Sequence, residues 1–435
     1  MDLLGDLGAV DQLTSARAEN EVLREQVKAL KQRCSVLAVE NESLKAEVEI
    51  YRSEAASSSS SLLGSSQARS SSAAPNGDGD DRDHFVRSGN GRYARSSAVN
   101  LENLHGASNV LTCSLSKDDS VLATGGADRK VSLTLWKTRS ADVKTVVDCD
   151  APVIAVDFAR HGRNPRFVAA GCMDGSVHVV YFETDDAAYT SSSSSSPSLR
   201  AEEIAPGTIK HGKYVRCLAW SSSDDLLATA SADGSVKVHR LDWNLVDGTG
   251  ATLEPVQTLQ LGGPVESICF REDVLCCYAR GSSNLSCFDL RDDFAQRKIN
   301  LNRGPGNKCF DDHVSFAVMD MTTRGDYLGL ATDSSRNIVM DWRTGHQVRN
   351  LYGHKNDGYS QPRLAWSGAN SEYLYGNSQH ENAVCVWDLA SSKIVERLEG
   401  HSNTVRDMFA SETTDTLVTT SFDKTTRFWT VPDGA

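Results

Sequence analysis

The sequence predicts an all-β fold made of repeated units, because similar segments of roughly 40–45 residues recur through residues 97–432. The last unit opens with Gly400-His401 and closes on Trp429, and the unit before it opens with Gly353-His354 and closes on Trp387. Within a unit, runs of β-favouring residues are separated by turns that contain Asp or Gly, as expected for strand, tight turn and strand. Such units, with four strands each, are typical of a β-propeller.

The closing positions set the expected number of blades at seven. They fall near an aromatic residue or its substitute, at Trp136, Tyr181, His239, Phe288, Trp342, Trp387 and Trp429. The second, fourth and fifth units are degenerate, so the sequence leaves a count of six to eight open. Closure usually needs the last blade to take a strand from the start of the domain, and residues 98–101 are expected to supply it.

Residues 16–52 show a heptad repeat of apolar residues, which predicts an α-helical coiled coil. The d positions hold Leu23, Leu30, Leu37 and Leu44, and the a positions hold Asn20, Val27, Cys34, Asn41 and Val48. Leucine at d with Val and Asn at a favours a parallel dimer, and none of the expected pairs between the flanking e and g positions is repulsive. A single solvated helix is the alternative.

Composition separates further segments from the folded parts. Residues 53–96 are rich in Ser, Gly and Asp and are expected to form a disordered linker, because they hold too little apolar surface to offset the entropy of ordering. A second serine-rich stretch, at about residues 185–203, is expected to be a loop inserted in the propeller at 97–432. Residues 1–15 are expected to be a lead-in to the coiled coil.

Charge and cysteine usage exclude several classes of protein. The net charge of −13 argues against direct nucleic-acid binding, which needs clustered Lys and Arg. The 11 cysteines follow no metal or disulfide spacing, so we expect buried thiols in a reducing compartment, with no metal and no cofactor. No stretch reaches the ~18 apolar residues of a membrane span. We therefore expect an intracellular protein, cytoplasmic or nuclear, with the cytoplasm favoured.

The residues that recur at the blade period resemble those of the WD-repeat (WD40) family of β-propellers. The resemblance implies a hydrogen-bonded network inside each blade, since a buried indole N–H and a buried carboxylate both need partners. The residues assigned to this network are His105, Thr124, Asp128, Trp136, His211, Thr229, Asp233, His354, Trp387, His401, Thr419, Asp423 and Trp429. Because the set recurs, we interpret it as structural, and we expect no catalytic residue and no enzymatic activity.

Partner contacts are expected at the rim of the central channel, because loops on a rigid scaffold carry recognition. Aromatic and Arg side chains are the usual interface anchors, and the candidates are Phe422, Arg406, Arg216 and Tyr214. The expected function is a non-catalytic scaffold or adaptor that forms a homodimer through its coiled coil and binds other proteins through its propellers. A substrate receptor of a ubiquitin ligase complex is the alternative. The domain order is similar to that of autophagy adaptors, Tup-type corepressors and lissencephaly proteins.

Overall fold

The computed structural model of the protein describes residues 95–136, 143–160, 166–185, 198–242, 251–302, 314–356, 361–368 and 372–430. The N-terminal lead-in, the coiled coil at 16–52 and the linker up to residue 94 lie outside these ranges. Most of the serine-rich stretch, residues 186–197, lies outside them as well. The predictions made for these segments stay predictions.

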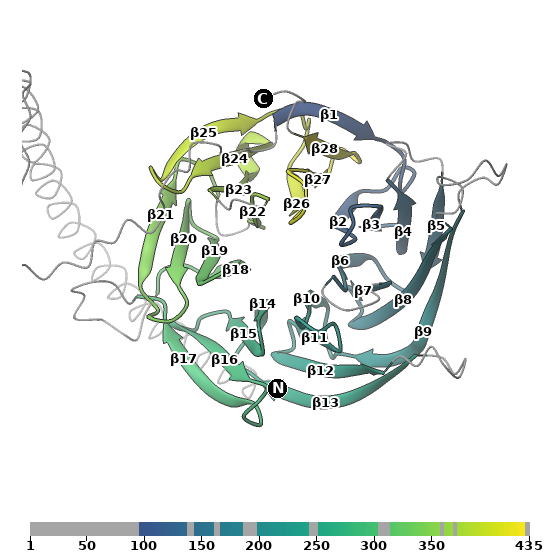
Figure 1. The fold of residues 1–435 in the computed structure, drawn as a ribbon, viewed down its shortest axis with the longest axis horizontal. Helices are drawn as coiled ribbons and strands as arrows, with labels where there is room; N and C mark the ends of the chain where they lie inside the picture. Colours follow the sequence, from purple (N-terminus) through teal and green to yellow (C-terminus); the bar gives the residue numbers. More distant parts are fainter. Residues whose placement is uncertain are drawn as a thin grey trace, which may run out of the picture. The chain divides into compact units, whose positions relative to one another are not determined.

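The described part of the chain forms seven four-stranded antiparallel sheets, arranged as blades around a centre (Figure 1). This confirms the predicted all-β, seven-bladed propeller. The first blade holds β2 (Val110–Leu115), β3 (Val121–Gly126), β4 (Lys130–Leu135) and β5 (Lys144–Asp148). The second holds β6 (Val153–Phe158), β7 (Phe167–Cys172), β8 (Ser176–Asp185) and β9 (Ser198–Lys210). The third holds β10 (Val215–Trp220), β11 (Leu226–Ser231), β12 (Ser235–Asp242) and β13 (Thr252–Gln260).

The remaining blades follow the same order from the centre outwards. The fourth holds β14 (Val265–Arg271), β15 (Val274–Ala279), β16 (Asn284–Asp289) and β17 (Ala295–Asn300). The fifth holds β18 (Val318–Arg324), β19 (Tyr327–Thr332), β20 (Arg336–Asp341) and β21 (Gln347–Tyr352). The sixth holds β22 (Leu364–Trp366), β23 (Tyr373–Ser378), the short 3₁₀ helix η2 (Gln379–Glu381), β24 (Ala383–Asp388) and β25 (Lys393–Leu398). The seventh holds β26 (Val405–Ala410), β27 (Leu417–Ser421), β28 (Thr426–Thr430) and β1 (Arg95–Leu101).

The first strand of the propeller completes its last blade. β1 pairs antiparallel with β28, with Val99 opposite Phe428 and Leu101 opposite Thr426, and Figure 1 shows it on the outside of that blade. Leu101 is buried in an apolar cluster with Leu104 and Phe428. Residues 98–101 therefore lie in the expected closing strand, which begins earlier, at Arg95.

The loop expected at about residues 185–203 is shorter than predicted at its end. β9 begins at Ser198 and pairs with β8 over a long ladder, in which Glu183 faces Arg200. Leu199 and Ala201 pack against the apolar cluster that joins the first and second blades. Residues 198–203 are strand because this packing and the ladder to β8 outweigh the polar composition that precedes them.

The hydrophobic core lies between neighbouring blades rather than within one. One cluster, for example, joins Leu133 and Leu135 of β4 to Val156 and Phe158 of β6. Each of the middle strands is therefore covered on both faces, and β3 and β11 are buried along their whole lengths. Strands buried on both faces are apolar throughout rather than alternating, and this explains runs such as the one in β11.

Candidate functional site

The seventh blade contains the complete polar network that the sequence indicates. His401 lies with Nδ1 2.8 Å from an Asp423 carboxylate oxygen and Nε2 2.8 Å from the Thr419 hydroxyl. The Trp429 indole N–H donates to the same hydroxyl at 2.9 Å. The pKa of His401 lies below its ordinary value, because the effect of burial outweighs the opposing effect of the Asp423 carboxylate. The imidazole is therefore a neutral bridge between the carboxylate and the hydroxyl, which is a structural role.

The first and third blades keep the histidine but differ in its partners. His105 contacts Asp128 at 2.8 Å and Thr124 at 2.9 Å. His211 contacts Thr229 at 2.8 Å, yet its other ring nitrogen lies 2.8 Å from the Ser235 hydroxyl. In that blade the carboxylate of Asp233 is 3.6 Å from the ring, so the serine carries the link to it.

Trp136 does not belong to the network, and this prediction was wrong. Leu417 faces Trp429 across the sheet, and Leu122 faces Thr134 at the matching place in the first blade. Trp136 lies two residues beyond Thr134. Its ring stacks on Phe428 of the seventh blade, with centroids 3.4 Å apart. Its ring therefore packs the first blade against the seventh, while its backbone N–H donates to the carbonyl of Ser120 in its own blade.

Tyr181 and Trp342, which were expected to close the second and fifth units, also lie beside the position of Trp429 rather than at it. The facing pairs of strands place Val180, not Tyr181, and Met340, not Trp342, at the position that corresponds to Trp429. His239, Phe288 and Trp387 do hold that position.

The sixth blade joins its histidine and tryptophan without a hydroxyl between them. Gly376 stands where Thr419 stands in the seventh blade, because Leu374 faces Trp387 as Leu417 faces Trp429. The indole N–H of Trp387 donates to the carbonyl of Tyr352 at 2.9 Å. His354 meets the edge of that indole, with ring centroids 5.2 Å apart.

Buried neutral histidines should make the propeller sensitive to acid. Burial lowers the pKa of His239 to about 4, and it also lowers the pKa values of His211 and His354 to about 4. The unfolded chain, with a His pKa near 6.5, therefore binds more protons than the folded one between about pH 4 and pH 6.5. The stability that these groups contribute is present above that window and is lost as the pH falls through it.

We expect a His239→Phe variant to lose less stability than the wild type between pH 7 and pH 4.5. The difference should reach up to about 3 kcal/mol, the value of a pKa shift of roughly two units. Urea unfolding at both pH values measures it. A His380→Phe variant is the control, because that side chain is exposed, and it should keep the wild-type loss. Equal losses in all three proteins would contradict the assignment.

A shared irregularity turns side chains of the innermost strands towards the central channel. In six blades the pairing of the inner strand skips its second residue, namely Leu111, Ile154, Arg216, Glu266, Met319 and Arg406. A β-bulge of this kind re-aims the extra side chain. All but Leu111 line one small cavity together with Pro362 and Arg363 of the sixth blade. The bulges thus build a narrow ring of side chains in the channel.

The charges near this ring are paired across blades. Arg363 lies between Asp320 at 3.2 Å and Asp407 at 3.1 Å, with all three side chains at most 16% exposed. Asp320 also accepts the backbone N–H of Leu364 at 3.0 Å, and Asp407 accepts that of Cys113 at 3.1 Å. Burial raises the pKa of Asp320. The two carboxylates therefore connect the fifth blade to the sixth and the seventh to the first.

Glu266 is the acidic residue among those that line the small cavity. Its carboxylate lies 2.6 Å from both Arg216 and Arg280. Nη1 of Arg406, in contrast, has no hydrogen-bond partner among the described residues. Burial, together with the neighbouring Arg363, lowers the pKa of Arg406 to about 10.

A second cavity, of about 270 Å³, is lined by residues of all seven blades. Arg160 lies in its wall, 2.7 Å from Asp157, and its guanidinium stacks over Phe409 with 4.2 Å to the ring centroid.

The structure brings two of the four candidate contact residues together. Arg216 and Arg406 line the same cavity, while Tyr214 and Phe422 are half-buried at the start of the third and in the last turn of the seventh blade. Backbone bonds link Phe422 to Thr404 and Tyr214 to Ala232. Sequence reasoning missed Glu266, which the second position of each inner strand could have indicated. It also missed the trio of Arg363, Asp320 and Asp407, for which no local signal exists.

Comparison with known proteins supports the repeats. Residues 99–133, 206–240 and 392–430 match the family model for the WD domain, G-beta repeat. These segments overlap the first, third and seventh blades, in which the histidine contacts a threonine. The chain therefore carries WD40 repeats within a seven-bladed propeller.

Several curated proteins are similar to parts of the chain. One is the probable cytosolic iron-sulfur protein assembly protein 1 of Kluyveromyces lactis, 31% identical over 28% of this chain and 34% of that protein. Another is the WD repeat-containing protein srw1 of Schizosaccharomyces pombe, 33% identical over 28% of this chain and 22% of that protein. A third is the nuclear distribution protein PAC1 of Arthroderma otae, 29% identical over 26% of this chain and 27% of that protein. The chain thus spans at most 34% of the length of each of these relatives.

Among the described residues, no helix has the length and apolar character that crossing a membrane requires.

Proposed function

We propose that the protein is a non-catalytic scaffold whose propeller binds other proteins at the mouth of the channel around Arg406. The observation that carries this proposal is that Arg216 and Arg406, two of the candidate contact residues, line one cavity of the channel. A guanidinium binds carboxylates and carbonyls through directed N–H groups, and Arg is enriched at interfaces. Phe422 and Tyr214, which are half-buried in the blades of Arg406 and Arg216, are the aromatic residues that we expect to add to this contact.

The non-catalytic part of the proposal rests on the blade networks. The ring nitrogens of His105, His211 and His401 face hydroxyls or carboxylates of their own blades. A catalytic constellation occurs once in a chain, whereas these contacts recur from blade to blade. The names of the relatives, which refer to assembly and to nuclear distribution, fit an interaction scaffold.

We infer further that residues 16–52 pair two chains in parallel, and that the linker lets both propellers reach one clustered partner. Tethering two sites in this way raises affinity by roughly 10²–10⁴-fold without new contacts, provided that the linkers span the gap.

The rim is tested by affinity capture with the full chain as bait. We expect Arg406→Met and Phe422→Ala each to reduce recovery of the partner by roughly 30-fold, the effect of an interface residue that contributes about 2 kcal/mol. Arg343→Met and Tyr352→Ala are matched controls, because both side chains are exposed outside the channel. Undiminished recovery by the folded rim variants contradicts the proposal. Rim-dependent recovery of a ubiquitin ligase scaffold supports the alternative function.

The dimer is tested by sedimentation of the full chain. We expect a mass twice that of the 47.2 kDa chain. Leu30→Pro should give the monomer, because proline in a helix interior costs ~3 kcal/mol or more. Ser58→Pro, in the predicted linker, should leave the dimer intact. A monomeric wild type at micromolar concentration rules the dimer out.

A further inference from the structure

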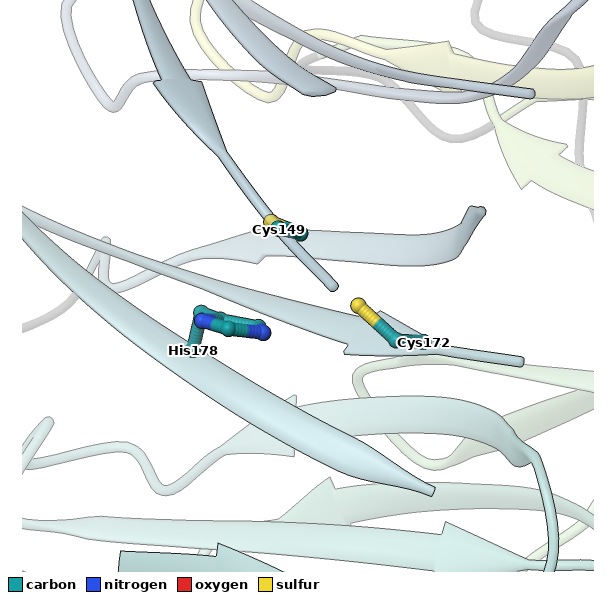
Figure 2. A group of neighbouring side chains, drawn as sticks. All are labelled: Cys149, Cys172 and His178. Carbon is teal, nitrogen blue, oxygen red and sulfur yellow. The ribbon is translucent and has the colours of Figure 1, made fainter. Parts of the chain in front are cut away.

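The second blade contains a cluster of two thiols and one imidazole. Cys149 lies between β5 and β6, Cys172 ends β7, and His178 lies on β8. Their Sγ, Sγ and ring nitrogen atoms all lie within 4.8 Å of one another, and all three residues are buried. Figure 2 shows the three side chains converging from these separate segments. The cluster plays no part in the proposed function.

This cluster stands in place of the polar network found in the first, third and seventh blades. Cys149 precedes the start of its inner strand, Val153, by four residues, as His211 precedes Val215 and His401 precedes Val405. Cys149 therefore stands where those blades have their histidine. Ala170 faces His178 as Thr229 faces Lys237, so the blade lacks the hydroxyl as well. The residues at these positions cannot rebuild the usual hydrogen bonds, and the cluster needs an explanation of its own.

A carboxylate fixes the orientation of the imidazole. Nδ1 of His178 lies 2.7 Å from Oε1 of Glu203 on β9. The second ring nitrogen, Nε2, is thereby left on the side of Ser176, whose hydroxyl is 3.3 Å away. A carboxylate that holds the far nitrogen of a histidine is the usual outer contact of a metal-binding imidazole, since it sets the tautomer and raises the basicity of the ligand.

We propose that Cys149, Cys172 and His178 bind a divalent ion of the zinc class, with a water molecule as fourth ligand. Two thiolates and an imidazole are the donors that zinc prefers, at about 2.3 Å for sulfur and about 2.0–2.1 Å for nitrogen. Tetrahedral donors at those distances lie roughly 3.5–3.8 Å apart, so the side chains need to move inwards by about 1 Å or less. On binding, each thiol releases its proton to solvent. The ion would tie the β5–β6 loop to β7 and β8, the task that the histidine performs in other blades.

The metal content of the full chain tests the site directly. The protein is purified with a thiol-free reductant, loaded with zinc, freed of excess ion and measured by plasma mass spectrometry. We expect about one zinc per chain in the wild type, and none in Cys149→Ala, Cys172→Ala or His178→Ala. Cys113→Ala is the matched control, because Cys113 is a buried thiol of the first blade outside the cluster, and it should bind as the wild type does.

A cobalt titration of the wild type keeps the proposal testable even where a ligand variant fails to fold. Thiolate ligation gives a sulfur-to-cobalt charge-transfer band, which we expect to saturate at one equivalent. Glu203→Gln leaves all three ligands in place and should weaken zinc binding by roughly 10–100-fold in a chelator competition. A reduced wild type that binds no zinc and develops no thiolate band overturns the proposal. Zinc that is retained equally by the cluster variants also overturns it.

Discussion

A chain that begins at Glu102 should fail to form a stable ring. It lacks β1, which is the outermost strand of the seventh blade. Without it, β28 becomes an exposed edge with unpaired backbone groups, a site for aggregation. The apolar contacts of Leu101 with Phe428 are lost at the same time. We expect the truncated chain to be aggregated or to lack a cooperative thermal transition, as measured by gel filtration and circular dichroism.

A chain that begins at Gly89 is the matched control, because it lacks the predicted coiled coil but keeps β1, and it should unfold cooperatively. Leu101→Ala gives a graded version of the same test within the full chain. Truncation of a buried leucine costs about 2–5 kcal/mol, and that loss should appear in urea unfolding. Equal midpoints of thermal unfolding for the chains that begin at Glu102 and at Gly89 would falsify the closure of the ring by β1.

The fold was predictable because its signal is local and repeated. The blades are encoded by short apolar runs separated by turns that contain Asp or Gly. The run at Leu226–Ser231 with the turn at Asp233 contains strand, turn and strand without reference to any distant residue. The closing strand was predictable because the last blade needs a fourth strand from the start of the domain. These inferences need neither register nor side-chain geometry.

Residue roles were less predictable, because they depend on strand register. Trp136 has the expected type and lies only two residues beyond the expected place, but that displacement moves it from the network of its own blade to the surface of Phe428. The spacing between the turn aspartate and the tryptophan was the one sequence feature that indicated this difference. Asp128 and Trp136 are farther apart than Asp423 and Trp429.

The long-range clusters had no signal at all in the sequence. Asp320, Arg363 and Asp407 come from three consecutive blades and meet because these blades pack side by side around the channel. Cys149, Cys172 and His178 lack every familiar metal spacing, and they converge because one loop and two strands of the second blade place them together. The packing of neighbouring blades defines the first site, and the pairing of strands within one blade defines the second.

Removal of the Arg363 guanidinium should be among the most destabilising substitutions in the propeller. Arg363→Met leaves the carboxylates of Asp320 and Asp407, 15% and 9% exposed, without their positive partner. Breaking a buried ion pair from one side costs about 3–5 kcal/mol, because the remaining charge stays desolvated. We expect a loss of this size at pH 7 in urea unfolding. Arg343→Met, with a side chain 72% exposed, should change stability by less than about 0.5 kcal/mol.

The pH dependence of that loss distinguishes lost charge from lost packing. Burial already raises the pKa of Asp320, and removal of Arg363 raises it further. A carboxyl whose pKa is higher in the folded state binds its proton more tightly there, so folding is favoured below the ordinary pKa and this advantage disappears as the pH rises through the shifted value. Relative to the wild type at the same pH, the deficit of Arg363→Met should therefore shrink as the pH falls from 7 to 4.5. Adding Asp320→Asn and Asp407→Asn should recover much of the loss at pH 7, because each amide keeps an acceptor for the backbone N–H of Leu364 or Cys113. A deficit that is independent of pH and unaffected by the two amides would show that Arg363 acts through its packing alone.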